Sequence, residues 1–308
     1  ITIPDNVTTI SSDAFTSSGL STVYMSYQTA YNLDKRFGTG KDFYGRTVEI
    51  IATDPDNPDG IVFPPEPFDP ANNLDSSNLE YTTLTHTDGT VYTGDITGEF
   101  VATDYNNTLL PANIQSVRIG TNVTSTGEGL FSGSTLQSVT IPDSVTSIGN
   151  NSFYNCTNLG SVTIPDSVTT IGNSAFYQCT GMQTLDLGEG VTDLGEQTFM
   201  KCSSLQSVIL PSSLSTLPQW QGQQFKECTG LQSVTIPEGI TVISYYMFDW
   251  CSSLQSVTLP NSIKIIGPSA FNYCTSLTSL TLPEGLEEID GDIIAFTQIT
   301  SLTLPDSL

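Results

Sequence analysis

The stretch Leu136-Gln-Ser-Val-Thr-Ile-Pro-Asp-Ser-Val-Thr-Ser-Ile-Gly149 decides the fold, because it returns almost unchanged as Leu159-Gly-Ser-Val-Thr-Ile-Pro-Asp-Ser-Val-Thr-Thr-Ile-Gly172. The two copies begin 23 residues apart. Further copies open at Ile114, Met182, Leu205, Leu231, Leu254, Leu277 and Ile299, and residues 1–20 carry the same pattern. A fixed period of this length predicts a solenoid in which one short unit stacks on the next.

The apolar positions of one unit predict its cross-section. They are Leu136, Val139, Ile141, Val145, Ile148, Phe153 and Cys156. The first three alternate as a short strand with its apolar side inward, and Pro142 ends that strand by removing a backbone donor. Gly149 is expected to loosen the backbone of the turn that follows. A single unit cannot bury these side chains alone, so each unit is expected to complete the core of its neighbour.

The repeated motif L-x-S-V-T-I-P-x-S-V-T-x-I-G-x-x-A-F-x-x-C resembles the BspA-type leucine-rich repeats, also called the Treponema pallidum type, over residues 1–26 and 114–308. The resemblance implies a leucine-rich-repeat solenoid, an α/β-type repeat fold of short stacked strands with an irregular or short helical convex side. It also implies an extracellular or cell-surface protein used for adhesion and protein binding.

The period breaks between residues 27 and 112, which predicts two arrays rather than one. Residues 1–52 are interpreted as the end of a first array with a strand–helix–strand closing piece, its helix near residues 27–37. Residues 53–80 are rich in Pro, Asp and Asn, as in a semi-extended linker. Residues 81–113 contain an alternating segment around Asp88-Gly89, which predicts a β-hairpin that caps the second array, residues 114–308. Both ends of the sequence fall inside a repeat, as expected for a segment of a longer chain.

The composition excludes some classes of partner. The 308 residues carry 32 acidic and 8 basic side chains, a formal net charge of -24. Binding nucleic acid or an anionic membrane surface requires Lys and Arg to displace counterions, so neither is expected. No run of about 20 apolar residues that could span a bilayer occurs, and no membrane insertion is expected in this segment.

Six cysteines occupy the same position in successive units, namely Cys156, Cys179, Cys202, Cys228, Cys251 and Cys274. Parallel side chains in such a ladder hold their β-carbons near 5 Å, farther apart than the roughly 3.8 Å that a disulfide prefers. A straight ladder also does not converge on one point, as four zinc ligands must. We therefore expect free, buried thiols that fill the core, and no cofactor is expected from them.

Carboxylates recur after the proline that ends the strand, or its equivalent, at Asp143, Asp166, Glu189, Glu238 and Glu284. Stacked units would line them up as an acidic stripe. A solvated row of charges is one interpretation; calcium bridged between the carboxylates is the alternative, because calcium prefers oxygen ligands.

The candidate binding residues are the outward ones that break the pattern. Most outward strand positions are Ser or Thr, whereas Arg118, Asp186 and Ile209 differ, and large aromatics gather on neighbouring units. Aromatic and Arg side chains are the usual anchors of protein interfaces. The candidates are Arg118, Asp186, Ile209, Trp220, Tyr245, Tyr246 and Trp250.

Catalysis is not expected, because His86 is the only histidine and lies far in sequence from every cysteine. The leading hypothesis is a non-enzymatic secreted or surface adhesion protein that binds an extracellular or cell-surface protein. The alternative is a structural subunit of a filament or coat, bound to other copies of itself through repeat ends or lateral contacts. Five N-glycosylation sequons, at Asn6, Asn106, Asn122, Asn150 and Asn155, leave glycosylation open.

Overall fold

The computed structural model describes residues 79–80, 82–87, 91–94, 96–101, 113–215, 217–218 and 222–308, together with the backbone of three strands before them. The chain divides into two compact units, Ile1–Glu66 and Pro67–Leu308. The expected helix near residues 27–37 and most of the expected linker lie outside the described residues.

The first unit contains a three-stranded parallel sheet in the order β1-β2-β3. Its strands are β1 (Thr2–Ile3), β2 (Thr22–Ser26) and β3 (Glu49–Thr53). Thr2 pairs with Tyr24, and Tyr24 pairs in turn with Ile51.

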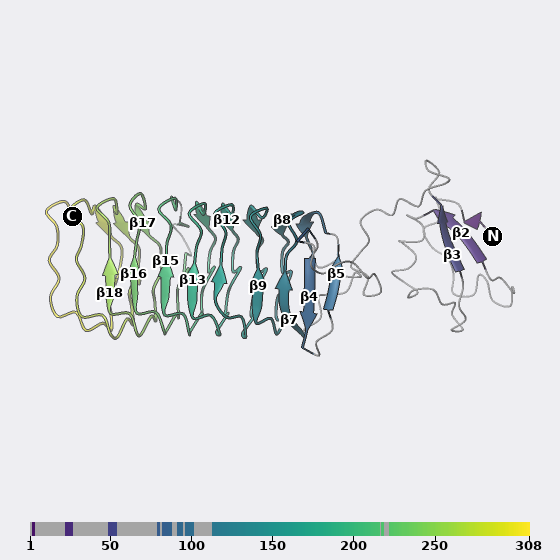
Figure 1. The fold of residues 1–308 in the computed structure, drawn as a ribbon. Helices are drawn as coiled ribbons and strands as arrows, with labels where there is room; N and C mark the ends of the chain where they lie inside the picture. The colour runs from purple at the N-terminus through teal and green to yellow at the C-terminus, as the bar shows by residue number, and fades with distance from the viewer. Residues whose placement is uncertain are drawn as a thin grey trace. The chain divides into compact units, whose positions relative to one another are not determined.

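The second unit is a solenoid whose first ladder of strands runs parallel along one side (Figure 1). In chain order its strands are β7 (Ile114–Arg118), β9 (Ser138–Thr140), β11 (Val162–Thr163), β13 (Thr184–Asp186), β15 (Ser207–Ile209), β16 (Ser233–Thr235) and β18 (Ser256–Thr258). These strands fall into two sheets, one that ends at β9 and one that begins at β11. Within each sheet, neighbouring strands pair in parallel at equivalent positions of the repeat, as Ser233 with Ser256. This regular register is what the 23-residue period predicts.

A second ladder forms where each unit turns back. Its strands are β6 (Gly98–Phe100), β8 (Val123–Thr126), β10 (Ser147–Ile148), β12 (Thr170–Ile171) and β14 (Asp193–Leu194), then β17 (Val242–Ile243), β19 (Ile265–Ile266) and β20 (Glu288–Ile289). These fall into two separate parallel sheets that end at β14 and resume at β17. The break coincides with the one longer unit, in which 26 residues separate Leu205 from Leu231.

Two further strands cover the first edge of the solenoid. β4 (Thr82–His86) pairs antiparallel with β5 (Val91–Gly94) on one side and with β7 on the other. The backbone groups of β7 are therefore paired on both sides, since β9 follows it in parallel. None of the described residues is helical, so the outer side of the described units is irregular and the short helical turns that the family permits are not seen there. The described part of the chain also contains no helix that could span a membrane.

The core is a continuous stack of the predicted apolar positions. Leu136, Ile141, Val145, Ile148 and Phe153 are buried, and Val139 packs partly buried against them. The phenylalanines of successive units stack face to face, with ring centroids 4.9 Å apart between Phe153 and Phe176 and 5.7 Å apart between Phe248 and Phe271. Each ring thus gains contact area from both neighbouring units, which a single unit could not supply.

Gly149 has a different role from the one its flexibility suggested. A β-carbon at this position would lie 2.5 Å from the backbone oxygen of Thr126 in the preceding unit. The same place is taken by Ser244 in a later unit, where the residue facing it is Gly222. Close approach between units therefore requires a glycine on one side of this contact, and either side can supply it.

Replacing Phe199 with Ala should lower the free energy of unfolding by about 3–5 kcal/mol, because the ring is fully buried between Phe176 and Phe225 and its loss leaves a cavity. Urea unfolding followed by circular dichroism measures the change. Thr163→Ala is the control, since it removes an exposed hydroxyl and should change stability by at most about 0.5 kcal/mol. Equal losses in the two variants would contradict a core built on the phenylalanine stack.

Candidate binding surfaces

The outward residues of the first ladder form an exposed face of hydroxyls, as expected. The exposed pairs are Ser138/Thr140, Ser161/Thr163, Ser233/Thr235 and Ser256/Thr258, and they continue at Ser279/Thr281 and Ser301/Thr303. Neighbouring hydroxyls bond one another in places, as where Thr184 Oγ1 donates to Ser161 Oγ over 2.7 Å. The face is therefore polar and partly satisfied by its own contacts.

Two of the predicted binding residues meet on this face. The parallel pairing of β13 with β15 sets Asp186 beside Ile209. Both are exposed, and 64% of Ile209 is open to solvent. An apolar side chain next to a carboxylate interrupts the hydroxyl face at this point.

Arg118 lies at the first edge of the solenoid and contacts the strand that covers it. Its Nη2 donates a hydrogen bond of 2.9 Å to Thr83 Oγ1, and the residue is half-buried. The guanidinium therefore joins β4 to β7, which is a contact within the protein.

The outer turns hold two of the aromatic candidates, Tyr246 and Trp250, in an unusual backbone conformation. The residue directly before each ladder cysteine has a positive φ, and so does the residue four positions earlier. We call the first set, together with Phe296 at the same repeat position before Thr297, the turn row. It comprises Asn155, Gln178, Lys201, Glu227, Trp250, Tyr273 and Phe296, with φ between 57° and 66°. Backbone amides connect the row, as where the Glu227 N–H donates to the Asp249 oxygen over 2.7 Å. Successive members of the turn row are therefore neighbours on adjacent units.

Three aromatic side chains stack at the end of the turn row. The Trp250 and Tyr273 rings lie 4.1 Å apart between centroids, and the Tyr273 and Phe296 rings 4.4 Å apart. Trp250 is 48% exposed and Phe296 is 66% exposed. Tyr273 and Phe296 were not among the predicted binding residues. The steps of 23 residues from Trp250 to Tyr273 and from Tyr273 to Phe296 would have identified them, because they place all three in one position of the repeat.

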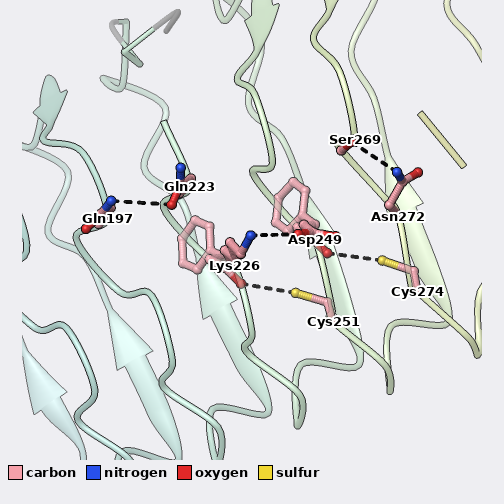
Figure 2. A network of polar contacts seen from close by, with 10 residues as sticks. Gln197, Gln223, Lys226, Asp249, Cys251, Ser269, Asn272 and Cys274 are labelled. Atoms are coloured by element: carbon pink, nitrogen blue, oxygen red, sulfur yellow. Dashed lines mark hydrogen bonds and ion pairs between the residues drawn. The ribbon is translucent and has the colours of Figure 1, made fainter. Parts of the chain in front are cut away.

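Tyr246 lies next to a lysine and a buried carboxylate. Lys226 Nζ lies 4.8 Å from the centre of the Tyr246 ring and 2.9 Å from Asp249 Oδ2, and Figure 2 shows this ion pair between neighbouring units. The neighbouring Tyr245 donates its hydroxyl to Asp290 Oδ2 over 3.2 Å. Trp220, the remaining aromatic candidate, lies outside the described residues.

The cysteines form an inward ladder of free, fully buried thiols, as predicted. Each Sγ donates to the backbone oxygen of the phenylalanine one unit earlier, from Cys156 to Phe131 over 3.0 Å through to Cys274 to Phe248 over 3.2 Å. Figure 2 shows two of these bonds, from Cys251 and Cys274. Burial raises the pKa of Cys156 to about 11 and the pKa of Cys202 and Cys274 to about 12. The thiols are therefore neutral core donors, and little thiolate is available for chemistry.

The acidic stripe takes part in a hydrogen-bond chain between units. Asp166 Oδ1 accepts from the Glu189 N–H over 2.9 Å, and Glu189 Oε2 accepts from both the backbone N–H and the hydroxyl of Ser212. These two carboxylates thus satisfy a backbone donor in the turn of the next unit. Within the described part of the chain, no group of three or more His, Cys, Asp or Glu side chains comes close enough to hold a metal ion. Calcium binding by the stripe stays a prediction.

His86 lies buried in β4, in the pair of strands that covers the solenoid edge. Its Nδ1 lies 3.1 Å from Asn113 Oδ1, in the segment that leads into β7. The contact places the ring in the attachment of β4 to the first full unit.

The buried thiols predict a specific dependence of stability on pH. The native state keeps the Cys202 proton up to a pKa of about 12, whereas the unfolded chain loses it near 9.0. Unfolding therefore releases a proton above pH 9, and the stabilisation present below that pH is lost as the pH rises toward 12, by about 1.4 kcal/mol per pH unit. Cys202→Ser should remove this contribution, and Ser134 shows that serine fits this position in another unit.

The measurement compares the free energy of unfolding of wild type and Cys202→Ser at about pH 8 and about pH 10.5, where the difference between them should change by about 2 kcal/mol. Other groups titrate in the same range but do so equally in both proteins. A difference that does not depend on pH would show that the thiol is not held neutral in the native state.

For the acidic stripe, Glu189→Ala should lower the free energy of unfolding by about 0.5–1.5 kcal/mol through loss of the two Ser212 bonds. Glu238→Ala is the control, because Glu238 is an exposed member of the stripe. Thermal melting with and without a chelator tests the calcium hypothesis, which requires the wild-type melting temperature to fall when the chelator is added. An unchanged melting temperature leaves the hydrogen bonds as the role of the carboxylates.

Comparison with known proteins agrees with this geometry. The model of the BspA type leucine-rich repeat region matches in six copies over residues 1–38, 105–221 and 220–308. Among solved structures, a leucine-rich repeat protein of Bacteroides ovatus is 27% identical with a TM-score of 0.61, over 72% of this chain and 55% of that one. The chain therefore spans little more than half the length of that protein. No curated protein matches the chain.

Two other solved structures are similar at lower TM-scores. A leucine rich cell surface protein of Faecalibacterium prausnitzii is 28% identical over 75% of this chain and 55% of that one, with a TM-score of 0.44. The leucine-rich repeat protein of T. pallidum is 24% identical over 56% and 87%, with a TM-score of 0.48. The matched repeats cover well over half of the sequence, and the register, the phenylalanine stack and the cysteine ladder follow the same period. The chain belongs to the BspA-type leucine-rich repeat family.

Proposed function

We propose that this chain is the repeat segment of a non-enzymatic cell-surface or secreted protein that adheres to another protein. The observation that carries the proposal is a set of exposed aromatic side chains on the outer turns, each more than a third open to solvent. Tyr246 and Trp250 lie in one unit, and Phe296 lies two units later at the repeat position of Trp250. Exposed aromatics in register on a rigid scaffold are typical of interface anchors, and a soluble protein otherwise has little reason to display them together.

The family supports the same proposal. Leucine-rich repeats of this type are associated with protein binding, and the stacked units present a long surface without needing a pocket. The thiols, which are the strongest nucleophiles in the described part of the chain, are buried and held neutral, and they have the core role already described. Binding is thus assigned to the outer turns and to the strand face around Asp186 and Ile209.

The test is the affinity of the purified chain for a partner captured by cross-linking on an extracellular surface. The double variant Tyr246→Ala with Trp250→Ala should weaken that affinity by at least about tenfold, because interface aromatics contribute on the order of 1–2 kcal/mol each. Tyr177→Ala is the matched control, since Tyr177 is an outer-turn aromatic stacked on Tyr154 and half-buried. An unchanged affinity in the double variant would assign recognition elsewhere.

The filament or coat hypothesis is tested in the same preparation. Sedimentation of the wild-type chain should give a single monomeric species over a range of concentrations. Growth of the species with concentration would support assembly from copies of the chain instead.

A further inference from the structure

The side chains of the turn row change from polar or charged to aromatic along the solenoid. Its first members are polar or charged, and Lys201 and Glu227 are followed directly by Trp250. An aromatic side chain at a positive φ is sterically disfavoured relative to Asn or Gly, so the aromatics are not there for the backbone. Their contribution is the exposed aromatic surface on the outer turns.

Stacking leaves one face of the Trp250 indole turned away from its partner. Tyr273 lies in the following unit and covers one face, with an angle of 11° between the ring planes. The opposite face is directed back along the solenoid toward the preceding unit, whose turn-row member is Glu227. The Glu227 N–H donates to the backbone oxygen of Asp249, the residue before Trp250, so Glu227 and Trp250 lie on outer turns that are directly hydrogen-bonded to each other.

The neighbouring aromatic shows what such a pair recognises. Tyr246 has Lys226 Nζ 4.8 Å from its ring centre, and the same ammonium group lies 2.9 Å from Asp249 Oδ2. A second lysine lies near a ring of the unit before it: Lys201 Nζ is 5.4 Å from the centre of the Tyr177 ring. At Lys226 an aromatic face and a carboxylate together hold the ammonium group, the arrangement in which a cation–π contact and an ion pair reinforce each other.

We propose that Trp250 and Glu227 form a binding site for a lysine or arginine side chain of a basic protein segment. The inference rests on the proposed protein-binding function and names the chemistry of the partner. In the part of the chain that the structure describes, the lysines that contact aromatic rings are placed over Tyr177 and Tyr246, and none is placed over Trp250. In the turn row Lys201 precedes Glu227 and Trp250 follows it. A cation bound over the indole would therefore approach Glu227 from the side opposite to Lys201.

The charge of the chain favours this occupant. A formal net charge of -24 attracts basic segments and repels acidic ones, and long-range attraction raises the rate of encounter. General attraction does not by itself select a site. Selection requires the indole face and the local carboxylate together, and this difference is what the experiment measures.

The experiment titrates isotope-labelled protein with a capped peptide of sequence Gly-Ser-Arg-Ser-Gly and with the same peptide carrying Gln in place of Arg. The readout is the indole N–H resonance of Trp250, identified with a Trp250→Phe variant. We expect a saturable shift of this resonance with the Arg peptide and none with the Gln peptide. Glu227→Gln should weaken Arg-peptide binding roughly two- to fivefold. Glu238→Gln removes the same charge from an exposed position of a nearby unit and should leave binding unchanged.

Three results would overturn the site. Equal shifts with the Arg and Gln peptides would mean that the cation is not recognised. Equal weakening by Glu227→Gln and Glu238→Gln would mean general attraction alone. A shift with cellobiose but not with the Arg peptide would make the indole face a sugar platform. Failure here is separate from failure of the proposed function, because the affinity of a captured partner for the Tyr246 and Trp250 double variant is measured independently of the peptide.

Discussion

Hydrogen bonds and apolar contacts between consecutive units carry this structure, because a unit of 23 residues cannot enclose a core of its own. Strands pair with strands at the same repeat position of neighbouring units, as the pairing of Ser233 with Ser256 shows. Each phenylalanine likewise packs between the rings of both neighbours. The residues that recur in every unit serve this contact between units. The outward residues that differ from unit to unit are the candidates for function.

Several features that suggest chemistry in the sequence turn out to serve the stacking. The cysteine thiols donate to the phenylalanine carbonyl of the preceding unit. That carbonyl also accepts a backbone N–H within its own unit, as Phe153 O does from the Cys156 N–H, so the thiol adds a bond between units. Two carboxylates of the acidic stripe, Asp166 and Glu189, accept backbone donors from the next unit. The serine that follows the stripe acts in the opposite direction, as Ser167 Oγ donates to the Val145 oxygen over 2.8 Å. Side chains thus bond backbone N–H and C=O groups of neighbouring units outside the short strands.

Sequence alone predicted the family, the inward positions and the free thiols, because these follow from a period that recurs many times. It could not predict which side of a contact needs a glycine, since that depends on how closely Gly149 approaches the Thr126 carbonyl. Arg118 was selected as an outward exception, yet its distance of 2.9 Å from Thr83 depends on an antiparallel strand whose register no repeat encodes. The repeat spacing places Tyr273 and Phe296 at the same position as Trp250, but the sequence contains many other aromatic residues and these two were not selected. The positive φ of their position became visible only in three dimensions.

The left-handed turn position has a consequence for how such a surface changes. Its φ is similar whether the residue is Asn155, Lys201 or Trp250, so side chains of different chemistry occupy this position on the same backbone path. A substitution there alters one level of the outer surface and leaves the core beneath it as it was. New specificities can therefore arise by exchanging single exposed side chains, or by gaining and losing whole units, without a new fold having to be found.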